Sequence, residues 1–446
     1  MFNPRYASNY SAELLDKIFH NERFQFTLSD EDFDLIASVI QRNRGKVNTH
    51  EKYMKLICKQ TGNRFHKEHI IKVYRQLIKT AAMERDIAFE NIMVKKSARG
   101  HSGVHVITIF TSPVQFGDGS EASIKRGGCP MNCHYCPFER DENGNATQPR
   151  SYLSTEPANL RASQNYHHPV GQIFSRLLTL EEIGHISPIE SKTSWECGKL
   201  EMIISGGTFN FYPHDYLRWF CTCMYFAANT YYEYRSNGSF SRDILSLEEE
   251  QHINETAGLR IIGLTIETRP DWLQEPMTSK PKGSSDYLNP IDFDKKLAGN
   301  SRHMFDVVRF FREIGVTRIQ IGLQHTDDAI LAGVNRQCTN QQNKKAIYFL
   351  KQNGFKVDGH FMLDLPNTTP ERDIEMLDEV LTDPNYEVDQ WKIYPTVVTP
   401  FTVIKKWYDA GEYRPYAEIN DGELLADVII HAKKKMKPWI RIKDRK

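Results

Sequence analysis

From residue 104 onward, short apolar runs alternate with amphipathic stretches, and this alternation limits the fold more than any other feature of the chain. The runs are rich in β-branched residues, as buried strands are, and helical periodicity recurs between most of them. Strand, helix and strand in succession predict parallel neighbours joined by right-handed crossovers. The predicted strands are residues 104–111, 200–205, 260–267, 317–324, 356–363 and 388–395.

Six such units predict an α/β fold with a partial (β/α)6 barrel over residues 101–400. In barrels of this kind the working residues lie at the carboxyl ends of the strands. Residues 401–446 are expected to form a helical extension with a basic tail. From Lys433 to the last residue there are eight Lys or Arg side chains and one acid, Asp444.

The first hundred residues predict a small helical domain. Ser29 can cap a helix in which Phe33, Ile36 and Ile40 recur at helical spacing. Residues 41–100 carry 15 Lys or Arg against five acids, although the whole chain has no net charge. A basic region on a neutral protein predicts a polyanionic partner, and a solvated helix face is the ordinary alternative.

The chain has no signature of a membrane or secreted protein. No apolar run approaches the roughly 18 residues that span a bilayer, and the first ten residues lack the apolar stretch of a secretory signal. We therefore expect a cytoplasmic protein with no membrane contact. Its eight cysteines should be reduced there, so closely spaced cysteines suggest a metal site instead of disulfides.

The segment GGCPMNCHYCPFE (127–139) places Cys129, Cys133 and Cys136 at the spacing C-x3-C-x2-C. Thiolates from one tight loop can ligate three irons of a 4Fe–4S cubane and leave the fourth iron open. An open iron can chelate S-adenosylmethionine, and one electron then breaks a carbon–sulfur bond to give a 5′-deoxyadenosyl radical. The alternatives are three buried thiols or a zinc site, which would want a fourth protein ligand. His134 lies between two of the cysteines, so its side chain should point away from a metal.

Several polar groups fall at predicted strand ends, where a cofactor should sit. Gly206, Gly207 and Thr208 follow the second strand, and bare glycine backbone there can bond the cofactor's amino group. Glu267 closes the third strand and could accept a bond from a ribose hydroxyl or pair with Arg269. The remaining candidates for cofactor binding are Gln324, at the end of the fourth strand, and Tyr135, inside the cysteine loop.

Ten segments occur in the order found in one known family. They are SGVHVITIFTSP (102–113), the cysteine loop, SYLSTEPANLRA (151–162), GKLEMIISGGTF (198–209), GLTIETRPDW (263–272), RIQIGLQ (318–324), VNRQCT (334–339), GFKVDGHFMLDLPN (354–367), WKIYPT (391–396) and KPWIRI (437–442). Because these segments occur in the same order, the chain resembles the catalytic subunit of Elongator, a family of tRNA wobble-uridine carboxymethyluridine synthases. The likeness runs from about Lys95 to Arg441.

The resemblance implies a radical S-adenosylmethionine (radical SAM) barrel and an enzyme of the acyltransferase class. It implies that Cys129, Cys133 and Cys136 hold the 4Fe–4S cluster and that S-adenosylmethionine is the cofactor. Acetyl-coenzyme A would be the acetyl donor, with Lys199 in contact with it. The radical would activate the acetyl group, which adds to carbon 5 of the wobble uridine, and hydrolysis would leave a carboxymethyl group. No other catalytic residue is assigned.

Two departures from the family affect these expectations. The first two cysteines are closer together than in many members, and the members continue beyond the position of Lys446 into an acetyltransferase-like domain. We expect Elongator-like subunits or a separate acetyl-coenzyme-A-binding domain to supply that function, and uncoupled cofactor cleavage by this chain alone. The alternatives are a non-catalytic tRNA-binding subunit or a radical SAM enzyme that acts on another RNA base. The intact cysteine triad favours an enzyme, because a pure binding protein gains nothing from an open iron.

The N-terminal helices also resemble the tRNA-binding region of the family. Basic side chains in and after these helices are our candidates for phosphate contacts with tRNA. They are Lys46, Lys52, Lys55, Arg64, Lys67, Lys72, Arg75, Lys95, Lys96 and Arg99.

Overall fold

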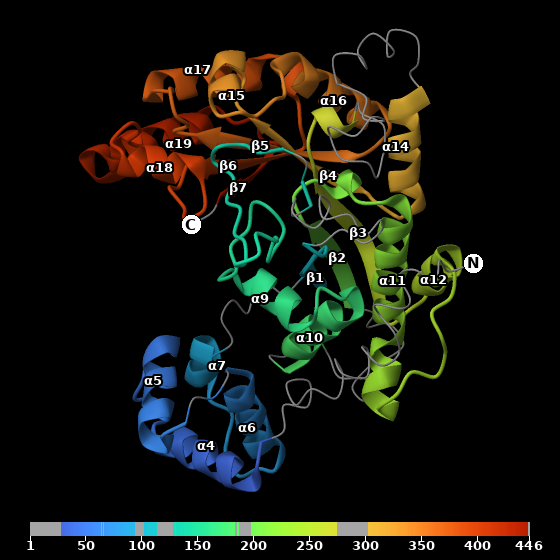
Figure 1. Cartoon of the computed structure of the whole chain (residues 1–446). Helices are drawn as coiled ribbons and strands as arrows, with labels where there is room; N and C mark the ends of the chain where they lie inside the picture. The colour runs from blue at the N-terminus through green and yellow to red at the C-terminus, as the bar shows by residue number, and fades with distance from the viewer. Residues whose placement is uncertain are drawn as a thin grey trace.

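A sheet of parallel strands, each paired with the next along the chain, forms the centre of the protein (Figure 1). The structure is a computed structural model that describes residues 28–63, 65, 67–93, 102–113, 128–129, 131–182, 185–186, 198–273 and 302–444. The strands are β1 (Val104–Phe110), β2 (Gly198–Ser205), β3 (Leu259–Thr268), β4 (Arg318–Gln324), β5 (Lys356–Leu363), β6 (Gln390–Pro395) and β7 (Arg441–Asp444). The α/β half-barrel and its six predicted strands are confirmed.

The seventh strand was not predicted, and the partial barrel is therefore larger than the six units expected. β7 lies inside the predicted basic tail and pairs in parallel with β6, with Arg441 opposite Gln390. Its four residues, RIKD, contain one apolar side chain, so they carry no run that reads as a strand. Basic residues on an edge strand discourage pairing with another chain. The division of the chain near residues 100 and 400 stays a prediction.

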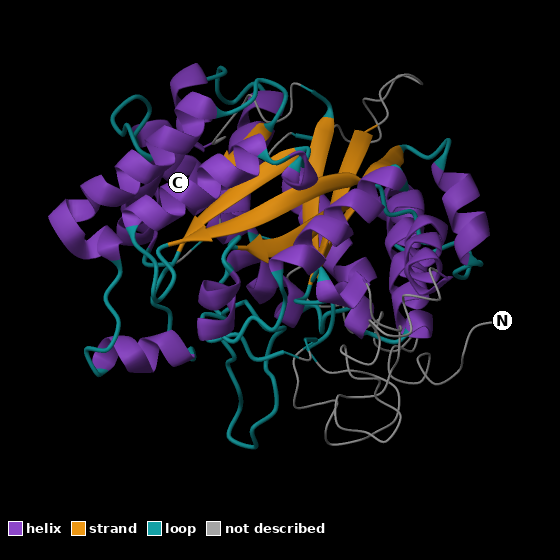
Figure 2. Cartoon of the chain, turned by 90° about the horizontal axis from the view of Figure 1, so that it is seen from above, coloured by secondary structure: helices purple, strands orange, loops and turns teal. Residues whose placement is uncertain are grey.

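One face of the sheet packs against helices (Figures 1 and 2). Ile107 and Ile109 of β1, with Leu200 and Met202 of β2, point into this core because side chains alternate along a strand. The helices that follow the N-terminal domain are α9 (Pro157–Gln164), α10 (Pro169–Glu182), α11 (His214–Asn237), α12 (Leu247–Asn254), α14 (Arg302–Glu313), α15 (Asp328–Gly333), α16 (Asn340–Gln352), α17 (Pro370–Thr382), α18 (Val403–Asp409) and α19 (Glu423–Lys435). None of the helices described is long and apolar enough to cross a membrane.

The opposite face of the sheet carries a polar layer across β4, β5 and β6. Arg318 of β4 lies 2.9 Å from the carboxylate of Asp358 on β5, and Gln390 of β6 donates to the same carboxylate at 2.8 Å. These side chains share one face because the strands are in register, with Gln320 opposite Asp358 and Asp358 opposite Gln390. The concave side of the half-barrel is therefore lined with hydrogen-bonding groups.

The N-terminal helices form a bundle with its own apolar core, beside α10 (Figure 1). Ser29 caps the first helix and accepts a bond from Asp32 N at 3.0 Å, as expected. Ile36, Ile40 and Tyr53 are among the buried residues of this bundle. The helices of the bundle are α4 (Asp30–Arg42), α5 (His50–Thr61), α6 (Lys67–Lys79) and α7 (Ile87–Met93).

Candidate functional site

The cysteine loop lies directly against the turn that follows β2. Thr208 donates its backbone N–H to the carbonyl of Gly128 at 3.1 Å. Its hydroxyl donates to Cys129 Sγ at 3.2 Å. The carboxyl end of β2 and the first predicted cluster ligand are thus brought together, as the motif at Gly206, Gly207 and Thr208 led us to expect.

This close approach requires glycine at two positions. Gly206 has a φ of +157°, and a Cβ atom there would lie 1.8 Å from Thr111 Oγ1, just after β1. Gly128 has a φ of +72°, and its Cβ would lie 2.0 Å from the hydroxyl of Tyr212. Only glycine tolerates these contacts and this backbone. The glycines therefore let the turn and the cysteine loop pack together; bonding of a cofactor's amino group there stays a prediction.

Cys133 lies beneath two arginines and is 6% exposed. The guanidinium groups of Arg269 and Arg336 donate to its sulfur, with Nη1–Sγ distances of 3.4 and 3.8 Å. Burial alone would raise the pKa of the Cys133 thiol, but the positive charges of Arg269 and Arg336 outweigh it and lower the pKa below its usual value. The arginines thus favour the thiolate, which is the form that binds a metal.

Cys136 lies in a different environment. Burial, followed by the negative charge of Cys133, raises the pKa of its thiol to about 11. Its sulfur lies 3.0 Å from the hydroxyl of Ser151. Metal binding would release the proton that this thiol otherwise keeps.

No group of three His, Cys, Asp or Glu side chains in the described ranges is arranged to hold one metal ion. A cubane binds each thiolate on a separate iron and does not need such a group. The ring of His134 packs edge-on against Trp407, with 4.9 Å between the ring centroids. The assignment of a 4Fe–4S cluster to Cys129, Cys133 and Cys136 stays a prediction.

Glu267 and Arg269 do not pair, so that alternative for Glu267 is wrong. Arg269 bonds the carboxylate of Asp271 at 3.0 Å instead, because both side chains turn into the protein beside the cysteine loop. Glu267 accepts a hydrogen bond from the hydroxyl of Tyr152. Its predicted contact with a ribose hydroxyl stays a prediction.

Gln324 precedes the short helix α15 in the chain, and Tyr135 packs against residues in and just after that helix. Gln324 ends β4 after an irregularity in the pairing with β5, and its φ of +72° is uncommon outside glycine. Tyr135 packs against a small apolar cluster that includes Val334 and Leu365. The roles of Gln324 and Tyr135 in cofactor binding stay predictions.

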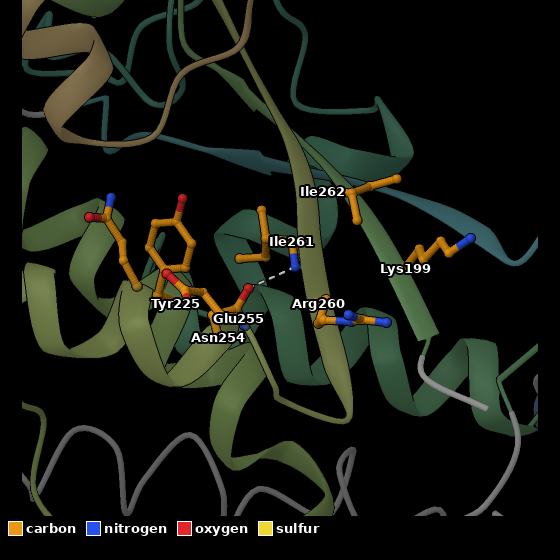
Figure 3. Close-up of a pocket in the computed structure, with 8 residues that line it drawn as sticks. Lys199, Tyr225, Asn254, Glu255, Arg260, Ile261 and Ile262 are labelled. Carbon is orange, nitrogen blue, oxygen red and sulfur yellow. Dashed lines mark hydrogen bonds between the residues drawn. The ribbon is translucent and has the colours of Figure 1, made fainter. Parts of the chain in front are cut away.

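Lys199 lies far along β2 from the cysteine loop. It is the second residue of the strand and is in register with Val104 and Arg260, at the amino ends of their strands. A pocket of about 380 Å³ lies at this end, between the strands and helices α11 and α12 (Figure 3). In Figure 3 the side chain of Lys199 extends away from Tyr225 on the other side of β3. Contact of Lys199 with acetyl-coenzyme A would therefore form away from the cluster.

The predicted tRNA contacts differ in exposure. Lys46, Lys52 and Lys55 are exposed, whereas Lys67 and Lys72 are half-buried. Arg75 is half-buried and donates to the carbonyl of Glu181 on α10 at 3.0 Å, so one of its contacts joins the bundle to the barrel. Its contact with a phosphate stays a prediction. The other four candidates, Arg64, Lys95, Lys96 and Arg99, lie outside the described residues.

Three residues of the site were missed from the sequence. Arg336 donates to Cys133, Ser151 contacts Cys136, and Tyr152 binds Glu267. Arg336 lies within VNRQCT, and the other two open SYLSTEPANLRA. These motifs were available as signals, but their spatial partners are far away in sequence.

Comparison with known proteins identifies one matching family model and several relatives of this chain. The family model described as the Radical_SAM C-terminal domain matches residues 388–443. The tRNA uridine(34) acetyltransferase of Methanocaldococcus infernus is 30% identical over 84% of this chain and 59% of the relative. That of Dehalococcoides mccartyi is 31% identical, over 78% of this chain and 60% of the relative.

More distant relatives agree. Elongator complex protein 3 of Homo sapiens is 28% identical over 78% of this chain and 52% of the relative. Among solved structures, that of Methanocaldococcus infernus Elp3 with an N-terminal deletion is 26% identical with a TM-score of 0.52, over 76% of this chain and 56% of that one. The chain thus spans between half and about three fifths of the length of these relatives.

Proposed function

We propose, on the premise that this chain is a homologue of the tRNA uridine(34) acetyltransferases and of Elongator complex protein 3, that it is a radical SAM enzyme modifying carbon 5 of the tRNA wobble uridine. The observation that carries the proposal is the cysteine loop, seated at the carboxyl end of a parallel half-barrel and packed on the Gly-Gly turn after β2. Working residues of such barrels gather at that end.

Cys129, Cys133 and Cys136 would hold a 4Fe–4S cluster. When bound, the cluster would supply the electron that cleaves S-adenosylmethionine. The residues of the chain fit such a group, because Arg269 and Arg336 bring positive charge to Cys133. Their charges would offset the negative charge of a thiolate-bound cluster, which is not favourable to bury alone.

The concave face of the sheet would receive the remaining reactants. Glu267, at the carboxyl end of β3 and held by Tyr152, has a carboxylate that could accept hydrogen bonds from a ribose. Arg318, Asp358 and Gln390 form a hydrogen-bonded layer nearer the amino ends of the strands. This layer would close the amino-end side of the reaction chamber, and its hydrogen bonds would fix the positions of the side chains there.

Mass spectrometry of tRNA digests tests the proposed reaction. The reduced, iron-loaded chain is incubated with tRNA, S-adenosylmethionine and acetyl-coenzyme A, in one reaction alone and in a second with an acetyl-coenzyme-A-binding partner. We expect carboxymethyluridine that depends on the acetyl donor only in the second reaction, and uncoupled cofactor cleavage in the first. Modification of a different base would favour the alternative radical SAM activity. Tight tRNA binding without product in either reaction would favour a non-catalytic subunit.

We propose acetyl-coenzyme A as the acyl donor. The chain alone should bind it weakly or not at all, so the titration uses the chain together with an acetyl-coenzyme-A-binding partner. In that mixture we expect Lys199→Ala to weaken donor binding about threefold to fivefold. An exposed lysine that meets a phosphate contributes up to about 1 kcal/mol. Isothermal titration calorimetry measures the change. Lys356→Ala is the matched control, since Lys356 is also an exposed lysine at the start of a strand but pairs with Asp389 at 3.1 Å. Equal affinity of wild type and Lys199→Ala would remove Lys199 from the donor site.

We propose tRNA as the partner of the N-terminal helices, and expect a triple change of Lys46, Lys52 and Lys55 to Gln to weaken tRNA binding. If these lysines each neutralise one phosphate, the slope of log affinity against log salt should become less steep by about 2–3. Fluorescence anisotropy at several salt concentrations measures both quantities.

The control for tRNA binding removes the same number of exposed charges from the barrel. Changing Arg309, Lys345 and Lys356 to Gln should leave the affinity and the salt slope close to wild type. An equal loss of affinity in both triple variants would show that tRNA responds to total charge and not to the helical bundle.

A further inference from the structure

Arg336 is a buried arginine whose side chain contacts Cys133 in the cysteine loop. It is 5% exposed and lies just beyond α15. Its neighbours Asn335 and Gln337 both have left-handed backbones, with φ of +54° and +53°. Such conformations are unfavourable outside glycine, so the surrounding structure must enforce them. The result is a guanidinium group fixed against Cys133.

Among the described residues, the charge of Arg336 has no carboxylate partner. Arg269, beside it, is paired with Asp271 at 3.0 Å. Within the described ranges no carboxylate forms an ion pair with Arg336, whose nitrogens contact only Cys133 Sγ and the carbonyl of Gly322. A buried, uncompensated cation is strongly unfavourable. The two arginines and the aspartate therefore leave one positive charge beside Cys133.

The fold reserves space for this charge. A Cβ atom on Gly322 of β4 would lie 2.8 Å from Arg336 Nη2 and 2.9 Å from Gln324 Nε2. Glycine at this position lets the guanidinium reach the strand and donate to its carbonyl. The position of Arg336 is thus built from two separate segments, the loop after α15 and the end of β4.

We propose that Arg336 is the counter-charge of the cluster and raises its reduction potential through the hydrogen bond to Cys133 Sγ. A cubane core held by three thiolates is an anion, of charge about −1 when oxidised and −2 when reduced. A fixed cation stabilises the reduced form more than the oxidised form, and hydrogen bonds to cluster sulfurs act in the same direction. Arg336 is thus a positioning residue for electron transfer. The inference rests on the cluster assigned under the proposed function.

The test is a redox titration of the iron-loaded full chain, followed by electron paramagnetic resonance without S-adenosylmethionine. At a fixed ambient potential, Arg336→Met should lower the ratio of reduced to oxidised cluster about tenfold, which is 59 mV for a one-electron couple. Arg336→Lys keeps the charge, so its ratio of reduced to oxidised cluster should fall less than that of Arg336→Met. Arg309→Met removes a side chain that is 72% exposed and should leave the ratio unchanged.

Thermal unfolding separates this electrostatic role from a structural one. In the iron-free chain, Arg336→Met should leave the melting temperature unchanged or raise it, because an uncompensated charge is removed. In the iron-loaded chain the same change should lower the melting temperature. If Arg336→Met lowered the melting temperature equally in the iron-free and iron-loaded chains, the role of Arg336 would be structural, through its bond to the Gly322 carbonyl. That result would overturn the proposal.

Further outcomes separate this inference from its alternatives. If Arg336→Met does not fold, Arg336→Gln removes the charge while keeping an amide donor, and its titration decides. An unchanged potential with weaker binding of S-adenosylmethionine would assign the guanidinium to the cofactor's carboxylate and refute the proposal. Wild-type protein that binds no iron would contradict the proposed function itself, whereas iron-loaded protein with an unchanged potential in Arg336→Met would contradict only this inference.

Discussion

Cys133→Ala is expected to lose its iron–sulfur cluster. Anaerobic reconstitution of the wild-type chain should load about four irons, the content of one cubane, whereas the variant should load close to none. Cys133 is the middle ligand of the loop and the one that both arginines contact, so its loss removes a thiolate and leaves the charge of Arg336 without that anion beside it. Iron content and visible absorbance after desalting measure the effect.

Cys58→Ala provides the matched control for the cysteine change. Cys58 is a half-buried thiol on α5 in the helical bundle, away from the cysteine loop. Its removal should leave the iron content at the wild-type value. Full iron loading of Cys133→Ala would show that another group replaces it as a ligand and would contradict the assignment.

Gly206→Ala is expected to destabilise the protein by about 2–5 kcal/mol and to reduce cluster loading. The new methyl group would overlap Thr111 Oγ1, which is held by the hydroxyl of Tyr212 at 3.0 Å and cannot turn away freely. Overpacking of a core typically costs about 1–3 kcal/mol, and an unfavourable backbone adds about 1–2 kcal/mol. Because the turn packs on Gly128 and Cys129, any shift that relieves the overlap also moves the cysteine loop.

Gly263→Ala is the control for this change. Gly263 lies inside β3, and a Cβ atom there would be 3.6 Å from its nearest neighbour, which is ordinary contact. Urea unfolding should show a change below about 1 kcal/mol for Gly263→Ala. If both variants were equally stable and loaded iron equally, the tight packing of the turn would not matter for the site.

Local pattern was enough to predict most of the barrel. Each of the six long strands has an apolar face, so β-branched runs such as 260–267 mark them. β7 escaped because an edge strand of four residues needs no apolar run to pair with β6. The helical bundle was also readable from periodicity, since its core residues recur at helical spacing.

The site was only partly predictable, because its contacts join distant segments. The spacing of the three cysteines and the glycines after β2 were sufficient to place the cluster loop. Periodicity could not show that Arg75 faces α10, that Arg269 prefers Asp271 to Glu267, or that Arg336 reaches Cys133. Each of these depends on where charged side chains turn after the chain folds, and several acceptable partners compete for them.

The most direct test of the central claim is the formation of 5′-deoxyadenosine. The reconstituted wild-type chain, supplied with a strong one-electron reductant and S-adenosylmethionine, should release 5′-deoxyadenosine, and the Cys133→Ala variant should release none. Liquid chromatography with mass spectrometry detects the product. Wild-type protein that carries one zinc and no iron, or that carries a full cluster and leaves S-adenosylmethionine intact under reduction, would contradict the account.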